Sequence, residues 1–317
     1  MECLKTSDKK TKAAETHCSE YMAQYNMREE ISRESFEVFP GITVIYNDVR
    51  GESFADRQSH SSSILEINHC RRGRIEYESA EGTEDEFRYL APGDLSISCG
   101  ADFRKKAYFP LQYYQGITII IDTGQAPGCL SCFLDDVEVR PEFLMQKFDN
   151  RGRGYIARSN ESVEHIFSEL YSVPEEIKKG YLKVKILELL LFLSAMEPEA
   201  ANETKTVSAE HARLAKEVCR YLTDRMDRRI TIDMLADRFH VSATLIKNCF
   251  RDVYGTSVYS YIRTQKMEKA AAILRETDLP VTEIAGRLGY DNSSKFAGAF
   301  RDVHGTTPAA YRKISSL

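Results

Sequence analysis

Two kinds of hydrophobic pattern divide the chain. From Phe36 to about Asp122, short runs of β-branched and aromatic residues are separated by turns that contain glycine or proline, which is typical of strands in a sandwich or small barrel. In one of these runs, alternation places Leu65, Ile67 and His69 on the same face of a strand. The predicted strands lie at 42–49, 62–70, 73–79, 86–98 and 116–122.

After residues 124–128 the hydrophobic spacing becomes helical. Ser159 or Asn160 can cap a first helix, whose apolar stripe consists of Val163, Ile166, Phe167 and Leu170. A second helix has a broad apolar face made of Leu182, Ile186, Leu189, Leu190 and Leu193. A helix this apolar is covered either by its own domain or by a second copy of the protein, and the pattern leaves both alternatives open.

Near the end of the chain, the octapeptide FRDVYGTS at 250–257 recurs as FRDVHGTT at 300–307. Each copy follows an apolar helical stripe, so each unit predicts a helix, a tight turn and a second helix. Ser242 is the predicted cap of one second helix, and Asp291 or Asn292 is the predicted cap of the other. Gly255 and Gly305 are expected to end these helices in the left-handed conformation.

Helix pairs of this kind occur in DNA-binding proteins, where the second helix enters the major groove, and also as plain structural hairpins. The outward face of the first candidate recognition helix carries Thr244, Lys247, Asn248 and Arg251. Asparagine can pair with adenine and lysine with guanine, whereas Arg251 is better placed for a phosphate. A solvated helix face can have the same composition, so both interpretations stand at this point.

Charge is distributed unevenly along the chain. The whole chain has a formal net charge of -5, yet residues 211–317 contain 18 Lys and Arg against 12 Asp and Glu, a net +6. A basic segment in an otherwise acidic chain favours an anionic partner for that segment. The bulk composition, 42% hydrophobic and 29% charged, is that of a folded protein rather than a disordered one.

The segment from ITIDMLADRF through YIRTQKMEKAAAIL to GTTPAAYR is similar to the DNA-binding domain of the AraC family of bacterial transcription regulators. The resemblance covers about a third of the chain and includes both helix pairs. It implies two recognition helices in successive major-groove segments, joined by a long rigid helix from about Ser257 to Thr277. It also implies promoter DNA and RNA polymerase as partners, and activation of transcription.

Both recognition helices depart from the family, whose members often have arginine where this chain has Asn248 in the first and Gly298 in the second. Carried over by position, the second helix presents Ser293, Ser294, Lys295, Ala297 and Gly298, with Arg301 directed to phosphate. This is a poor set for contacts to base edges, and a glycine inside a helix costs about 1 kcal/mol relative to alanine. We therefore expect the first helix pair to specify sequence and the second to contact phosphates.

The strand-rich region resembles, more loosely, the cupin-like sensor barrel that many such regulators carry, which implies a small-molecule effector. The alternative is a cupin-type metal enzyme fused to a DNA-binding module. Only His60 and His69 fall in this region, without a His-x-His pair, so we expect no metal site, no cofactor and no catalytic residues. Cys129 and Cys132 form one Cys-x-x-Cys without a second pair, which favours two incidental thiols over a redox or zinc site.

The sequence thus predicts a multidomain α and β protein. Its longest apolar stretch, 186–196, is shorter than the roughly 20 residues of a membrane span, and its N-terminus does not resemble a signal peptide. We therefore expect a cytoplasmic, homodimeric, effector-responsive regulator. Its expected parts are a mobile arm (1–30), a small cupin-like β-barrel that senses the effector (31–128), a helical extension for dimerisation (129–197), a linker (198–210) and an all-α DNA-binding domain of two helix-turn-helix units joined by a long helix (211–317).

Overall fold

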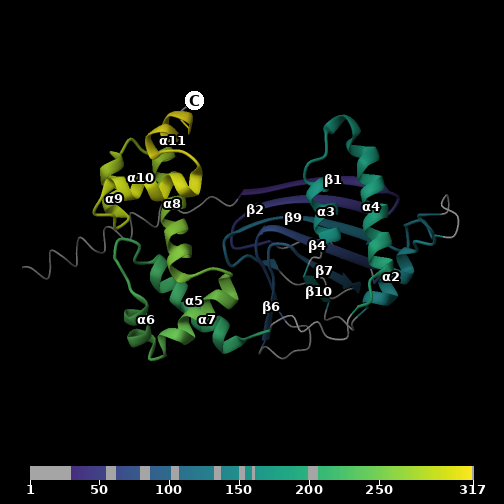
Figure 1. Cartoon of the computed structure of the whole chain (residues 1–317), viewed down its shortest axis with the longest axis horizontal. Coiled ribbons are helices and arrows are strands. Elements are labelled where there is room, and N and C mark those ends of the chain that lie inside the picture. Colours follow the sequence, from purple (N-terminus) through teal and green to yellow (C-terminus); the bar gives the residue numbers. More distant parts are fainter. Residues whose placement is uncertain are drawn as a thin grey trace, which may run out of the picture. The chain divides into compact units, whose positions relative to one another are not determined.

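A computed structural model describes residues 30–54, 62–78, 86–100, 107–131, 137–149, 154–158, 161–198 and 206–315. The described residues fall into two compact units, one within 29–209 and one within 210–317. The first unit combines β-sheets with helices, and the second is built of helices (Figure 1). The predicted arm, apart from its last residue Glu30, lies outside the described residues, as do Ser159, Asn160, His60 and Cys132.

The strands of the first unit form two antiparallel sheets. The larger has the strand order β1-β2-β9-β4-β7-β10 and the smaller the order β11-β6-β5-β8-β3. An antiparallel β domain is therefore present, whereas the narrower assignment to a cupin-like barrel stays a prediction. The strands are β1 (Glu30–Phe39), β2 (Ile42–Arg50), β3 (Ser53–Phe54), β4 (Ile64–Gly73), β5 (Ile75–Glu78), β6 (Glu86–Leu90), β7 (Asp94–Cys99), β8 (Ala107–Tyr108), β9 (Tyr113–Asp122), β10 (Tyr155–Arg158) and β11 (Val207–Ser208).

Five strands lie where the hydrophobic pattern did not predict them, the two-residue strands β3 and β8 among them. β1 begins at Glu30 and is mostly exposed along its length, so it lacks the buried alternation that marks a strand. β10 belongs to the region 129–197, expected to be helical, but it pairs with β7. β11 lies in the expected linker and pairs with β6. Strands of two or four residues bury too few side chains to produce a readable period.

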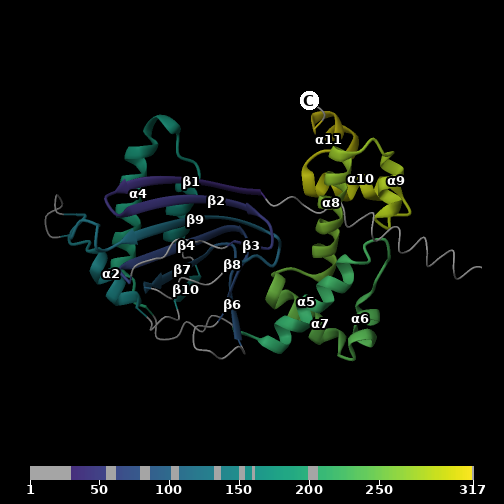
Figure 2. The same ribbon diagram turned by 180° about the vertical axis from the view of Figure 1, so that it is seen from behind.

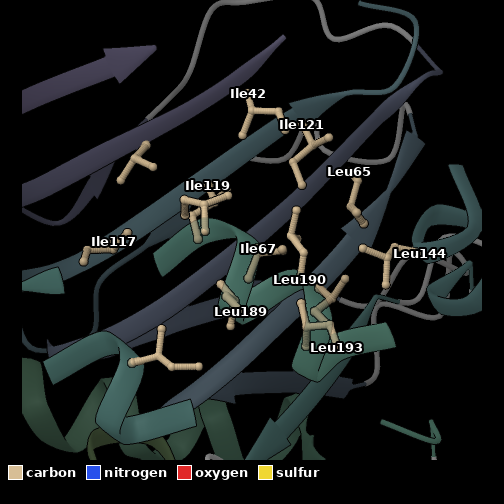
Figure 3. Close-up of a cluster of buried hydrophobic side chains, with 14 of the residues drawn as sticks. Ile42, Leu65, Ile67, Ile117, Ile119, Ile121, Leu144, Leu189, Leu190 and Leu193 are labelled. Carbon is tan, nitrogen blue, oxygen red and sulfur yellow. The ribbon is translucent and has the colours of Figure 1, made fainter. Parts of the chain in front are cut away.

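Helices cover one face of the larger sheet (Figures 1 and 2). These are α2 (Pro141–Phe148), α3 (Glu161–Leu170) and α4 (Lys178–Ala195), the last preceded by a short 3-10 turn at Glu175–Ile177. Figure 3 shows Leu189, Leu190 and Leu193 of α4 directed at isoleucines of the sheet such as Ile67 and Ile119. Burial of a leucine or isoleucine side chain contributes about 1.5–3 kcal/mol, so this layer holds the helices on the sheet.

The second unit contains α5 (Ala209–Thr223), α6 (Ile232–Phe239), α7 (Ala243–Tyr254), α8 (Val258–Glu276), α9 (Val281–Arg287), α10 (Ser293–His304) and α11 (Pro308–Ser315). Ser257 caps α8, and Thr277 follows its last residue, which confirms the predicted long helix. The interior of this unit is aromatic and aliphatic, with Phe250, Phe296 and Phe300 fully buried. Within the described residues, none of the helices is long and apolar enough to cross a membrane.

Candidate nucleic-acid interface

Side-chain caps begin α6, α7 and α10, whereas α9 follows Pro280 without one. The Thr231 hydroxyl accepts a hydrogen bond from the amide of Met234 at 3.3 Å, and Ser242 accepts one from the amide of Leu245 at 3.1 Å. In the second pair the cap is Asn292 rather than Asp291, because its side-chain oxygen accepts from the amides of Ser294 and Lys295. The predicted helix starts are therefore confirmed. Three residues separate α6 from α7, and five separate α9 from α10.

The repeated octapeptide ends one helix and starts the next. Gly255 and Gly305 follow α7 and α10 with φ values of 70° and 72°, in the left-handed region that glycine adopts without a steric penalty. Two residues later, the Ser257 hydroxyl accepts from the amide of Ser260 at the start of α8. Thr307 does the same for Ala310 in α11. The chain repeats the octapeptide because the same change of direction follows each second helix.

The buried and exposed faces of α7 and α10 are clearly separated. α7 buries Ile246, Cys249, Phe250, Val253 and Tyr254, and α10 buries Phe296, Ala299 and Phe300. All eight residues proposed to contact DNA are exposed: Thr244, Lys247, Asn248, Arg251, Ser293, Ser294, Lys295 and Arg301. The structure places these residues on the surface in two groups, one on each second helix.

The four cations of this set differ from other cations of the same unit. Among the described residues, Lys247, Arg251, Lys295 and Arg301 form no hydrogen bond or ion pair through their side chains. Several other cationic side chains of the unit are engaged within the protein. Arg287 bonds Glu283 at 2.6 Å, Arg275 bonds the Tyr311 hydroxyl at 2.7 Å, Arg312 donates to the carbonyls of Leu274 and Leu279, and Arg263 pairs with Asp302.

The two exposed faces carry different chemistry. At the positions of α10 that correspond to Lys247 and Asn248 stand Ala297 and Gly298. Outside its own helix backbone, no atom of the described chain lies within 4 Å of the position a Cβ would take at Gly298. Packing inside the protein therefore does not require a glycine there. The exposed surface of α10 offers small residues flanked by Lys295 and Arg301, whereas α7 offers longer side chains that donate and accept hydrogen bonds.

The first unit has a polar row on the sheet face opposite the helices, buried at Asn47, Thr118 and Asn68 and exposed at Arg33. Arg33 donates to Asn47 at 3.1 Å, Asn47 donates to Thr118 at 2.9 Å, and Thr118 donates to Asn68 at 2.6 Å. Asn68 in turn donates to Glu66 at 2.5 Å. The row crosses strands β1, β2, β9 and β4. From the smaller sheet, the Tyr77 hydroxyl lies 3.2 Å from the Ser96 hydroxyl of β7, so polar groups of both sheets meet here.

His69 lies on the other face of the same sheet, as the alternation predicted. Its ring stacks on Phe167 of α3 at 4.0 Å, and its Nδ1 lies 3.2 Å from the Tyr171 hydroxyl. Burial lowers the pKa of His69 to about 4, so the ring is neutral near pH 7. Within the described residues, no group of three or more His, Cys, Asp or Glu side chains could hold a metal ion. Cys129 lies 3.7 Å from the Ser131 hydroxyl.

Comparison with known proteins identifies a helix-turn-helix domain in the second unit. A family model described as a helix-turn-helix domain matches residues 235–314. An uncharacterized HTH-type transcriptional regulator of Bacillus subtilis, YtdP, is 25% identical over 118 residues, which are 37% of this chain and 15% of that protein. The transcriptional regulator Rob of Salmonella typhimurium is 29% identical over 106 residues, 33% of this chain and 37% of that protein.

Two further matches cover the same part of the chain. The xylose operon regulatory protein of Escherichia coli is 28% identical over 96 residues, 30% of this chain and 24% of that protein. The DNA-binding domain of AdpA, a global transcriptional factor solved with a target DNA, is 29% identical with a TM-score of 0.31 and covers 32% of this chain and 90% of that one. The chain spans between 15 and 37% of the length of the three sequence relatives.

The helix-turn-helix match and the sequence relatives together identify one class of domain. The C-terminal unit contains a helix-turn-helix domain that is similar to parts of transcription regulators. Because the matching relatives are regulators, the comparison disfavours the enzyme alternative.

Sequence reasoning missed several residues that organise this domain. The Arg263 and Asp302 pair, and the contacts of Gly289 described below, join segments distant in the chain. The signal for Gly289 was the difference in length between the two turns, because this glycine lies in the longer one, between α9 and α10.

Gly298 within α10 and Gly305 at its end have opposite expected effects on stability. Gly305→Ala places an L-residue at a φ of 72°, so we expect the free energy of opening of α10 to fall by about 1–2 kcal/mol. Gly298→Ala adds a methyl group in open space within the helix, so we expect it to rise by about 1 kcal/mol. Hydrogen exchange of the α10 amides measures both. A loss of protection in Gly298→Ala would show that Gly298 is a packing residue.

Proposed function

We propose that this protein is a sequence-specific, effector-responsive transcription activator that binds promoter DNA through both helix pairs of its C-terminal domain. The observation that carries the proposal is the pair of exposed polar faces on α7 and α10. Their cations have no partner within the described chain, in a domain matched by the helix-turn-helix model. Activation would proceed through contact with RNA polymerase, and action on the chromosome makes the cytoplasm the proposed location.

The two helix pairs would contact different parts of the DNA, α7 the bases and α10 the phosphates. Lys247 and Asn248 of α7 have the groups that recognise guanine and adenine in the major groove. On α10, the corresponding Ala297 and Gly298 have no group that can recognise a base through hydrogen bonds. Lys295 and Arg301 can instead bind phosphates, and the absence of a side chain at Gly298 permits close approach of the sugar-phosphate backbone.

This division predicts different effects of substitutions in the two helices. With full-length protein at one stated salt concentration, Lys247→Ala and Asn248→Ala should each relax base preference at one position, with a loss of about 1–3 kcal/mol for the preferred duplex. Lys295→Ala and Arg301→Ala should weaken binding to all sequences alike, and each should reduce the slope of log K against log salt by about 0.9. Selection from random duplex DNA followed by salt titration measures both.

The matched control is Ser294→Ala, which leaves every cation in place. If it abolishes sequence preference while Lys247→Ala and Asn248→Ala keep it, the assignment of roles is wrong. If the wild-type protein enriches no motif beyond general duplex binding, either an effector is required or the helix pairs are structural.

The proposed dimer would form through the outer face of α4. One face of this helix is buried against the sheet, yet Val184 and Leu191 lie on the opposite side, with 64 and 40% of their surfaces exposed. Ile177, seven residues before Val184 and just before the helix, is 52% exposed. Such a stripe matches the seam along which two helices pack side by side. A second copy of the same helix is the simplest partner, because it presents an identical stripe.

A carboxylate within this stripe should dissociate the dimer. We expect Val184→Glu to sediment as a monomer at concentrations at which the wild-type protein is a dimer, because a buried, unpaired charge opposes association. Lys179→Glu introduces a carboxylate at an exposed position outside the stripe and serves as the control. Sedimentation velocity on the full chain measures whether each protein is a monomer or a dimer. A monomeric wild-type protein, or a dimer unaffected by Val184→Glu, would contradict the proposal.

The effector would bind on the polar row between the sheets. Thr118 is the centre of this row, since its hydroxyl accepts from Asn47 and donates to Asn68. Strands otherwise rich in isoleucine have no structural need for buried amides and hydroxyls. Such groups suit a small polar molecule that exchanges hydrogen bonds with them. The proposed ligand class is therefore small, polar and rich in hydrogen-bonding groups.

Thermal unfolding in the presence of monosaccharides, amino acids and small carboxylic acids tests this site. A ligand at about 100 times its Kd should stabilise the wild-type protein by about 2.7 kcal/mol, and Thr118→Val should remove that response. Thr43→Val makes the same change on β2 outside the row and should keep the response. A ligand that stabilises the wild type and Thr118→Val equally would place the effector site elsewhere.

A further inference from the structure

The second helix pair contacts the segment that leads into the first. Gly289, in the turn between α9 and α10, has a φ of 74°, and a Cβ there would lie 2.7 Å from the backbone oxygen of Asp227 and 3.2 Å from that of Met226. Both oxygens belong to the segment between α5 and α6, which precedes the first helix pair. A side chain cannot fit at this position, so the backbone of one helix pair lies directly against the segment that leads into the other.

A lysine from the middle of the joining helix α8 reaches the same place. The Lys266 ammonium lies 5.7 Å from the centroid of the Tyr290 ring, next to Gly289. Burial lowers the pKa of Lys266, and the carboxylate of Asp227 partly offsets this effect. One side chain therefore interacts with a residue on each side of the contact. We call Asp227, Lys266, Gly289 and Tyr290 the inter-pair joint.

The long helix α8 contacts each helix pair separately, through residues other than those of the inter-pair joint. On the second helix pair, Arg263 of α8 pairs with Asp302 of α10, and the His304 ring nitrogen Nε2 lies 3.2 Å from the carbonyl oxygen of Met267. On the first, the rings of Tyr254 and Tyr261 lie 4.8 Å apart. These contacts attach each pair to the helix separately. The inter-pair joint connects the pairs to each other and so restrains bending and twisting of one against the other.

We propose that the inter-pair joint fixes the separation of α7 and α10 and thereby makes the protein selective for the number of base pairs between its two DNA half-sites. This inference rests on the proposed binding of DNA by both helices. One added base pair moves the second half-site by about 3.4 Å along the duplex and turns it by about 34° around the axis. A domain whose helix pairs are rigidly connected cannot follow that displacement and loses contacts on one half-site.

Selection from random duplex DNA, run in parallel with full-length wild-type protein and three variants, tests the proposal. Lys266→Met keeps the apolar stem and removes the ammonium, and Gly289→Ala forces the two backbones apart. Gly286→Ala is the matched control, since a Cβ there meets no other part of the described chain within 4 Å. The wild-type protein and Gly286→Ala should recover one dominant spacing, with a change of one base pair lowering affinity about tenfold.

Lys266→Met and Gly289→Ala should recover both half-motifs at two or more spacings, whose affinities differ by less than about threefold. Recovery of the half-motifs itself shows that a variant is folded, and Lys266→Met decides the question if Gly289→Ala does not fold. If Lys266→Met keeps the single wild-type spacing, the joint has no such role. If the wild-type protein recovers no two-part motif, the proposed binding by both helices is wrong instead.

Discussion

Burial of one phenylalanine in each helix pair determines which way the proposed DNA-contacting faces point. Phe250 and Phe300 are fully buried, and each lies within an aromatic cluster that repeats along the chain. Phe250 contacts Tyr254 and Tyr261, whereas Phe300 contacts His304 and Tyr311. Once these rings occupy the core, the helical period leaves the polar residues of α7 and α10 on the surface. The exposed cations follow from that anchoring.

Much of the C-terminal domain could be predicted because its determinants are local. The Ser242 side chain accepts a hydrogen bond from the amide of Leu245 at the start of α7, and Gly255 ends the same helix. A short window of sequence therefore contains the whole signal. The repeated octapeptide presents the same pattern a second time in the chain. Gly289 is different, because its significance depends on a carbonyl oxygen 62 positions earlier in the chain. Nothing in its immediate sequence identifies that contact.

The first unit shows the same limit in its sheets. Alternation in β4 correctly separated His69 from Asn68, because a period of two is a local property. It did not reveal that Asn47, Asn68 and Thr118 form one row, since they come from three strands whose order follows only from the pairing register. The edge strand β1 and the short strands β10 and β11 also depend on partners far away in the chain.

A rigid connection gives the second helix pair a means of contributing to specificity. Phosphates are alike at every position of a duplex, so contacts from Lys295 and Arg301 to phosphate alone carry no sequence information. If Gly289 and Lys266 hold α10 at a fixed distance from α7, the same contacts become sensitive to where the backbone lies relative to the bases that α7 reads. They then respond to groove width and bending of the intervening DNA. A helix with Ala297 and Gly298 at its centre can in this way restrict the sites that the protein occupies.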